Sequence, residues 1–170
     1  MALLEQRNDW PDKADWNALD TEISELWESK EYRPVALGVI RDSKGRLLMV
    51  RSAKNPEKPN LPQGGIDPRE SLLPGLFREL YEELGITSNQ LSITGFLGTH
   101  REEHPDATDK RGFTKGKAYF AFELEYHGPE RLKIRAPEEI ESYEWIGEPS
   151  MFNSMRNAFK RKIANQVLQR

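Results

Sequence analysis

The chain has 170 residues, and its composition of 36% hydrophobic and 31% charged residues is typical of a single globular domain with its own core. It contains no cysteine, which excludes disulfide bonds and thiolate metal sites. A net charge of −3 favours no class of partner by itself. No apolar run approaches membrane-spanning length, and the N-terminal residues MALLEQRNDWPDK lack the order of a signal peptide, so we expect a cytoplasmic protein.

Charged residues are unevenly distributed along the chain. Residues 1–31 hold nine acids against three bases, whereas the segment from Met151 onward holds five bases and no acid. The basic end is either the solvated face of a helix or a patch that helps to bind a polyanion.

The predicted elements indicate a mixed α/β domain. Apolar residues at helical spacing predict a helix over 17–29, so we expect an N-terminal helical extension over 1–31 and a second unit over 32–170. Residues 55–70 are rich in Pro, Gly and Asn, which predicts a loop. Strands are predicted at 33–42, 45–53, 91–100, 117–126, 131–136 and 143–146. Two more helices, one from Ser71 to a stop at Gly85 and one over 151–168, complete a largely β core with helices packed outside it.

The helix predicted over residues 72–84 has an apolar side and an acidic side. Its apolar side is formed by Leu73, Leu76, Phe77, Leu80 and Leu84. Glu79, Glu82 and Glu83 fall within an arc of about 100° on the adjoining side, given the helical period. Only Arg78 offers a nearby positive charge.

Such a cluster of carboxylates is unfavourable by itself. Like charges three or four residues apart on a helix repel each other, and a partly buried carboxylate without a partner costs more. A divalent cation would relieve both effects, and a set of oxygen ligands without His or Cys suits hard ions such as Mg²⁺ or Mn²⁺. The alternative is a glutamate-rich helix face exposed to solvent.

The preceding loop, with its sequence PQGG, favours the metal site, because two glycines let the backbone approach a ligand closely. Together, the loop and the helix form one pattern: Gly64, five residues, Glu70, seven residues, and then RELYEELGI from Arg78 to Ile86. This pattern resembles the Nudix box, G-x5-E-x7-R-E-U-x-E-E-x-G-U with U aliphatic, at every specified position. The resemblance implies an α/β/α sandwich around a mixed β-sheet.

The resemblance also implies a metal-dependent pyrophosphohydrolase in which water attacks phosphorus. The metal ligands that it implies within the box are Glu79, Glu82, Glu83 and the carbonyl of Gly64. Glu79 is either a ligand or the base that orients the attacking water. Glu70 and Arg78 would form a salt bridge that fixes the loop against the helix. The cofactor would be Mg²⁺ or Mn²⁺.

Beyond the box, the chain is similar to the branch that contains RNA pyrophosphohydrolases and diadenosine tetraphosphate hydrolases. The stretch PEEIESYEWI resembles a late segment of that branch and makes Glu139 a further metal ligand. The residues that would contact substrate are Arg33, Arg51, Lys115, Lys117 and Tyr119. The stretch TKGKAYFAF departs from the bacterial RNA pyrophosphohydrolases and is closer to the diadenosine tetraphosphate hydrolases.

These features predict an enzyme that cleaves a phosphoanhydride bond of dinucleoside polyphosphates or of 5′-triphosphorylated RNA ends. The alternative within the family is another nucleoside diphosphate derivative: a nucleotide sugar, ADP-ribose or a modified dNTP. A catalytically silent domain that binds nucleotide or RNA is a further alternative, although the chain retains the box carboxylates. The expected partners are therefore nucleotide substrates or an RNA 5′ end, and no membrane.

Overall fold

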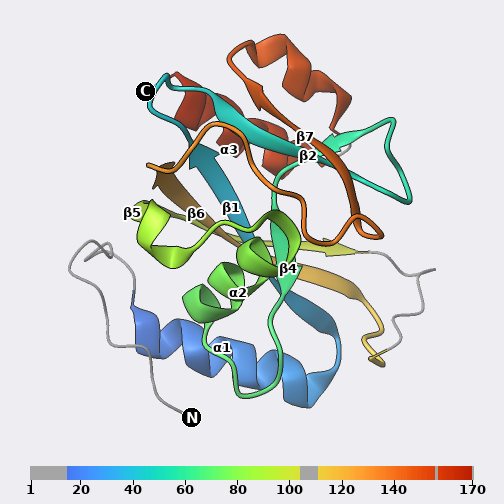
Figure 1. Cartoon of the computed structure of the whole chain (residues 1–170). Coiled ribbons are helices and arrows are strands. Elements are labelled where there is room, and N and C mark those ends of the chain that lie inside the picture. Colours follow the sequence, from blue (N-terminus) through green and yellow to red (C-terminus); the bar gives the residue numbers. More distant parts are fainter. Residues whose placement is uncertain (1–14, 104–110, 156, 170) are drawn as a thin grey trace.

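Helices cover both faces of a central β-sheet in the computed structural model of the chain (Figure 1). The structure describes residues 15–103, 111–155 and 157–169. Residues 1–14 of the acidic N-terminal segment lie outside these ranges. In chain order the elements are α1 (Trp16–Ser29), β1 (Tyr32–Arg41), β2 (Leu47–Ser52), β3 (Pro59–Asn60), β4 (Gln63–Gly65), α2 (Leu72–Leu84), η1 (Ser88–Gln90), β5 (Leu91–Glu103), β6 (Gly116–Tyr126), β7 (Ile140–Ile146), η2 (Pro149–Ser154) and α3 (Ala158–Leu168).

The sheet is mixed, as predicted. Its strand order is β3-β2-β1-β6-β5, with β4 paired to β1 and β7 paired to β2. Strands β1 and β6 are parallel and place Arg33 opposite Lys117, whereas the other pairs are antiparallel. The strand β4 brings Gly64 next to Ala36 in the centre of β1. The box loop therefore starts in the middle of the sheet and not at its edge.

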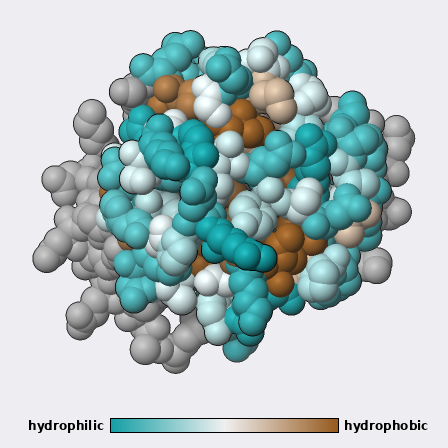
Figure 2. Space-filling view, turned by 45° about the horizontal axis from the view of Figure 1, so that its top comes forward, coloured by the Kyte–Doolittle hydropathy of each residue, from teal (hydrophilic) through white to brown (hydrophobic). Residues whose placement is uncertain are grey.

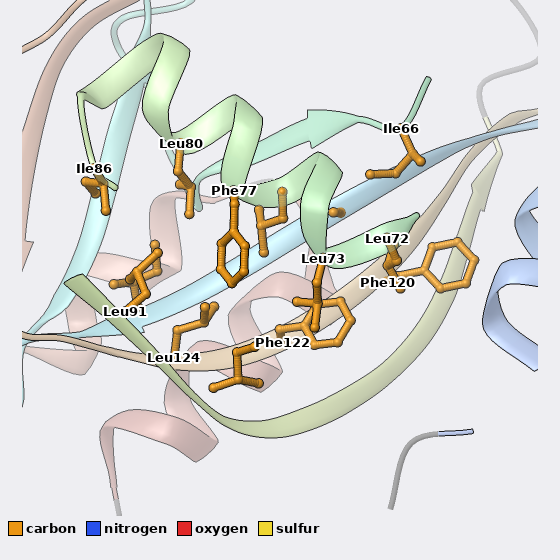
Figure 3. Packing of buried hydrophobic residues seen from close by; sticks show 14 of the residues in the cluster. Ile66, Leu72, Leu73, Phe77, Leu80, Ile86, Leu91, Phe120, Phe122 and Leu124 are labelled. Carbon is orange, nitrogen blue, oxygen red and sulfur yellow. The ribbon is translucent and has the colours of Figure 1, made fainter. Parts of the chain in front are cut away.

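Two hydrophobic clusters, one on each face of the sheet, hold the three layers together. Alternate residues of β1 point to opposite faces, so Ala36 and Ile40 belong to one cluster and Leu37 and Val39 to the other. The first cluster contains the apolar sides of α1 and α2, and the second contains α3 and η2. Figure 3 shows the side chains of α2, including Phe77, pointing onto those of β6. This arrangement confirms the predicted α/β/α sandwich.

The helix α1 belongs to the same core as the helix that carries the box. Its buried residues Leu19, Ile23 and Leu26 join the cluster under α2. The division of the chain near residue 31 stays a prediction. Among the described residues, no helix is both long and apolar enough to cross a membrane.

The strand predicted over 131–136 is wrong. The backbone of this segment finds partners outside the sheet: the amide of Arg135 donates to the Glu83 carbonyl at the end of α2 (2.8 Å), and the amide of Leu132 donates to the Tyr143 hydroxyl (2.8 Å). The segment thereby covers the C-terminal end of α2 instead of extending the sheet.

The single helix predicted over 151–168 is also wrong, because the structure divides it into η2 and α3. Asn157 caps α3, and its side chain accepts a hydrogen bond from the Lys160 amide, so the helix restarts at Ala158. The loop predicted over 55–70 contains the two short strands β3 and β4, which Pro and Gly content does not reveal.

Candidate active site

The two glycines of β4 allow two side chains to lie directly on the backbone. A Cβ at Gly64 would be 2.0 Å from Cγ of Glu79, and a Cβ at Gly65 would be 2.2 Å from Nη2 of Arg33. Any side chain at either position would displace one of these residues. Gly64 therefore allows α2 to approach β4 closely, and Gly65 leaves room for the guanidinium of Arg33.

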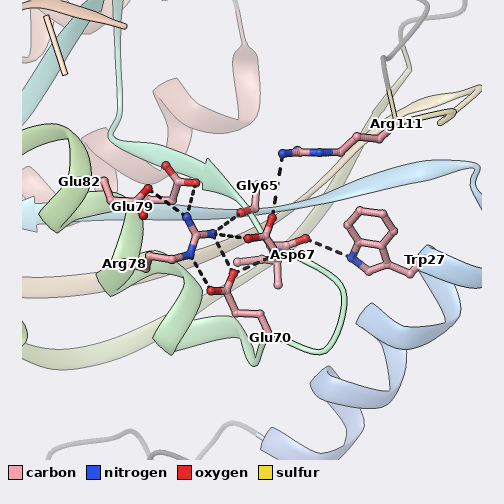
Figure 4. Close-up of polar contacts among 9 residues, drawn as sticks. Trp27, Gly65, Asp67, Glu70, Arg78, Glu79, Glu82 and Arg111 are labelled. Carbon is pink, nitrogen blue, oxygen red and sulfur yellow. Dashed lines mark hydrogen bonds and ion pairs between the residues drawn. The ribbon is translucent and has the colours of Figure 1, made fainter. Parts of the chain in front are cut away.

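Arg78 is the centre of the polar contacts in the box (Figure 4). Its guanidinium holds Glu70 with two hydrogen bonds, from Nε to Oε2 (2.7 Å) and from Nη2 to Oε1 (2.9 Å). It also donates to the Gly65 carbonyl (3.2 Å), to Oε1 of Glu79 (3.0 Å) and to Oε2 of Glu82 (3.2 Å). Arg78 thus ties the loop, the sheet and the acidic side of α2 together.

The contact between Arg78 and Glu70 affects the charge state of both. Burial raises the pKa of Glu70, but the hydrogen bonds from Arg78 and from the Asp67 amide outweigh it, so the pKa is lowered overall. The hydrogen bond to Glu70 is the largest cause that raises the pKa of Arg78. Both groups are therefore charged at neutral pH, and the salt bridge has the position predicted from the sequence.

In a second group of carboxylates, formed by Glu79, Glu83 and Glu139, the positive charge of Arg78 reaches only Glu79 directly. Glu83 lies against the other two, and burial, followed by the charges of Glu79 and Glu139, raises its pKa to about 8. Burial also raises the pKa of Glu79. Glu139 reaches this position because its carbonyl accepts a hydrogen bond from the Ala53 amide (2.9 Å), which fixes the turn before β7 against the end of β2.

The carboxylates fit a hard divalent cation in their chemistry, since all the donors are oxygens and a cation would neutralise the crowded charge that raises the pKa of Glu83. They do not form a finished cage: within residues 15–103, 111–155 and 157–169, no three His, Cys, Asp or Glu side chains are grouped as a metal site. Glu79 and Glu82 bond to Arg78 instead, and Glu82 is exposed.

These carboxylates line one wall of a cavity of about 660 Å³, which also contains Gly64 and Gly65. Two further acids, Glu102 and Glu138, belong to the lining. Its basic side chains are Arg33, Lys54, Lys58, Arg111, Lys117 and Lys160. The face in Figure 2 is mostly hydrophilic, with hydrophobic patches between the hydrophilic side chains. A cavity lined by both carboxylates and cations suits a polyanion bound through metal ions.

Three of the five predicted substrate residues line this cavity: Arg33, Lys117 and Tyr119. The ring of Tyr119 is buried, which raises its pKa. Arg51 is not part of the lining. It donates to the Pro56 carbonyl (2.9 Å) and to Oε1 of Glu144 (3.2 Å), and so supports the loop between β2 and β3.

Lys115 also lies away from the cavity lining, and its ammonium pairs with Glu31 at 3.2 Å. Side chains two residues apart share a face only within a strand. Lys115 precedes β6, so this rule does not apply to it, whereas Lys117 belongs to β6 and lies opposite Arg33 of β1 in the sheet register.

Lys160, a buried lysine of α3, is one of the five bases of the C-terminal segment, but it is not among the predicted substrate residues. Its ammonium donates to Oε1 of Gln63 (2.6 Å) and to Oδ1 of Asn60 (3.0 Å), and it lies 4.6 Å from the ring centroid of Tyr119. Burial, and then the charge of Lys117, lowers its pKa to about 8. The signal was present: Lys160 shares the buried side of α3 with Ile163 and Val167.

A three-layer α/β/α fold with clustered carboxylates beside a cationic cavity defines a class of protein, the hydrolases that act on phosphoanhydrides with the help of divalent ions. The NUDIX domain model matches residues 31–167, and the chain belongs to the Nudix family. It is therefore a Nudix pyrophosphohydrolase, as the sequence predicted.

Relatives and solved structures agree with this assignment. The chain is 30% identical over 158 residues to an RNA pyrophosphohydrolase of Novosphingobium aromaticivorans, which covers 86% of this chain and 96% of that protein. The fold is similar to that of the E. coli dihydroneopterin triphosphate pyrophosphohydrolase (TM-score 0.68, 20% identity, 82% of this chain and 98% of that one). It is also similar to the fold of a C. elegans Ap4A hydrolase in a binary complex (TM-score 0.57, 19% identity, 79% and 92%).

Proposed function

We propose that the chain cleaves a phosphoanhydride bond of 5′-triphosphorylated RNA ends or of dinucleoside polyphosphates by water attack on phosphorus, with Mg²⁺ or Mn²⁺ as cofactor. The observation that carries the proposal is the single cavity in which Glu79, Glu83 and Glu139 face a substrate space shared with Arg33 and Lys117. The 30% identity to a protein named RNA pyrophosphohydrolase supports the RNA substrate.

The acidic residues would hold the metal ions, and the Arg78–Glu70 pair would position them. Glu79, Glu83 and Glu139, with Glu82 and the Gly64 carbonyl, would hold the cations. When bound, these ions would supply positive charge against the phosphates and acidify the attacking water. Arg78 and Glu70 position the carboxylates and the loop.

The cationic residues of the cavity would bind the phosphate chain. Arg33 and Lys117 stand opposite each other on β1 and β6. Lys160 reaches the same space from α3 through its contacts with Gln63 and Asn60. Cations from three elements therefore converge where a substrate with several phosphates needs them.

The proposal is tested by product analysis with Mg²⁺ on a small panel. It comprises diadenosine tetraphosphate, 5′-triphosphorylated RNA, ADP-ribose, a nucleotide sugar and dNTPs. Release of phosphate or pyrophosphate from RNA, or ATP plus AMP from the dinucleotide, supports the proposal. Turnover of the sugar nucleotide or ADP-ribose alone would overturn the substrate class but keep the chemistry. Nucleotide or RNA binding without turnover of any of them would favour a catalytically silent domain.

Replacing Glu139 by Ala is expected to lower kcat at least about tenfold more than replacing Glu138 by Ala, because a metal ligand contributes directly to charge stabilisation. Both side chains line the cavity, but Glu139 is the one that lies against Glu83. Steady-state kinetics on the best substrate of the panel measure the difference. Equal losses in the two variants would remove Glu139 from the ligand set.

Replacing Lys160 by Met is expected to lower kcat/KM about 10- to 100-fold, since a hydrogen bond to a charged group contributes about 1.5–3 kcal/mol. The pH profile makes the test specific. In the wild type, kcat/KM should fall as the pH rises through about 8, where Lys160 loses its charge, and this fall should be absent from the Met variant.

Stability gives a second readout for the same variant. The pKa of Lys160 in the folded state, about 8, lies below its ordinary value of 10.5, so the unfolded chain binds more protons between these values. Wild-type stability must therefore gain from a rise in pH between about 8 and 10.5, relative to the variant. A difference in Tm between the two proteins that does not change with pH would mean that folding does not lower the pKa of Lys160.

A further inference from the structure

The helix α1 contacts the box loop, residues 64–71, near the start and near the end of the loop. At the start of the loop, the indole Nε1 of Trp27 donates to the Ile66 carbonyl over 3.1 Å, and Figure 4 shows the ring reaching from α1 toward the loop. At its end, Asp20 interacts with the Leu72 amide and the Ser71 hydroxyl. Ser71 makes no side-chain cap of its own on α2.

The bonds from Arg78 reach the box loop from α2 and do not include Ile66. Arg78 binds Glu70 and the Gly65 carbonyl from α2. Ile66, between these two points, is fully buried, and its amide donates to the Pro34 carbonyl of β1 (3.0 Å). Without the Trp27 indole, its carbonyl would lose its partner at a buried position, which is costly.

The same end of α1 also holds the segment that returns to β6. The Lys30 ammonium lies 4.2 Å from the Trp27 ring centroid and 4.9 Å from that of Phe113, and it donates to the Arg111 carbonyl (3.3 Å). The rings of Trp27 and Phe113 pack edge to face at 5.1 Å. Trp27 therefore contacts the backbone directly after Gly65, which lines the cavity, and packs against Phe113 in the segment that contributes Arg111 to the lining.

We propose that Trp27 is a positioning residue for the active site: by holding the Ile66 carbonyl, it fixes the backbone from Gly64 to Asp67 at the distance from Glu79 that catalysis requires. The N-terminal helix then both covers one face of the sheet and positions the active site. The proposal rests on the proposed function, because it takes Gly64 and Glu79 as parts of the reacting site. Trp27 itself touches no substrate.

The test compares Trp27→Phe with Trp145→Phe. Trp145 is a matched control, since its indole also donates to a backbone carbonyl, that of Glu130 over 2.9 Å, and its ring also packs against the core, but it lies outside the cavity. Both variants keep an aromatic ring and lose one hydrogen bond, and Tm should fall more in Trp27→Phe because Ile66 is buried whereas Glu130 is exposed.

Only Trp27→Phe is expected to change the site. Its kcat should fall about tenfold, with KM changed less, because small misplacements distant from the chemistry reduce rates steeply. Hydrogen exchange should become faster in peptides that cover residues 64–70, and binding of Mn²⁺ alone, followed by the EPR signal of the free ion, should weaken. In Trp145→Phe, all three should match the wild type.

Equal kcat, exchange and Mn²⁺ affinity in the two variants would overturn the proposal. If Trp27→Phe does not fold, Asp20→Ala tests the other end of the loop, with the same three expected changes and the same contrary result. Failure of the proposed function remains distinguishable: wild-type protein inactive on the whole panel would refute that function, while the exchange comparison would still report on the loop.

Discussion

Replacing Glu83 by Gln is expected to reduce kcat by at least about 10³-fold, because losing even one charge-stabilising group in an active site costs about 10²–10³-fold. Gln keeps the shape of the side chain but cannot supply a carboxylate to a cation. The fold should remain intact, because a carboxyl whose pKa is raised to about 8 is largely neutral at pH 7 in the metal-free protein, and Gln is a neutral side chain of the same shape. Steady-state kinetics and a thermal unfolding curve measure both effects.

The response to metal ions separates this explanation from misfolding. A ligand that binds only the folded state raises Tm, so Mn²⁺ should stabilise the wild type more than Glu83→Gln. The matched control is Glu25→Gln, the same chemical change at an exposed position of α1. It should leave kcat and the Mn²⁺ effect unchanged. Unchanged turnover in Glu83→Gln would remove the metal-site argument altogether.

The fold could be predicted where a pattern repeats along one element. Apolar spacing locates α1 and α2, and the stop at Gly85 is correct because its φ of 68° lies in the left-handed region that glycine adopts easily. The strand predicted over 131–136 failed for a physical reason that a local pattern does not contain: Arg135 bonds to Glu83, which is distant in the sequence.

The candidate site shows the same division. Glu79, Glu82 and Glu83 lie on one helix, so their spacing predicts their proximity, and the resemblance to the Nudix box implies the Arg78–Glu70 bridge. The basic residues Arg33, Lys117 and Lys160 come to the cavity from β1, β6 and α3. Spacing along the sequence does not show which lysines of separate elements lie at one site. Lys115 and Lys117 are the same residue type and are separated only by Gly116, yet only Lys117 lines the cavity.

Replacing Arg78 by Lys is expected to lower kcat/KM at least about 100-fold, because the misplaced loop and carboxylates lose the geometry on which catalysis depends. A lysine keeps the charge but has no planar fork, so it cannot hold both oxygens of Glu70 and also reach the Gly65 carbonyl. We expect a loss of about 1–3 kcal/mol in the free energy of unfolding, from buried acceptors left without a donor.

The pH dependence of that loss identifies its origin. The pKa of Glu70 is lowered in the folded state, so its bridge to Arg78 stabilises the protein above the ordinary carboxyl value of 4.5 and is lost as the pH falls. The difference in Tm between wild type and Arg78→Lys should therefore shrink below about pH 4.5. Arg46→Lys is the matched control, since Arg46 binds Asp42 and Glu130 in a similar way outside the cavity. It should lower Tm and leave kcat/KM unchanged, because a bridge that supports only the fold does not align the reacting groups. Equal kinetic losses in both variants would mean that Arg78 contributes stability alone.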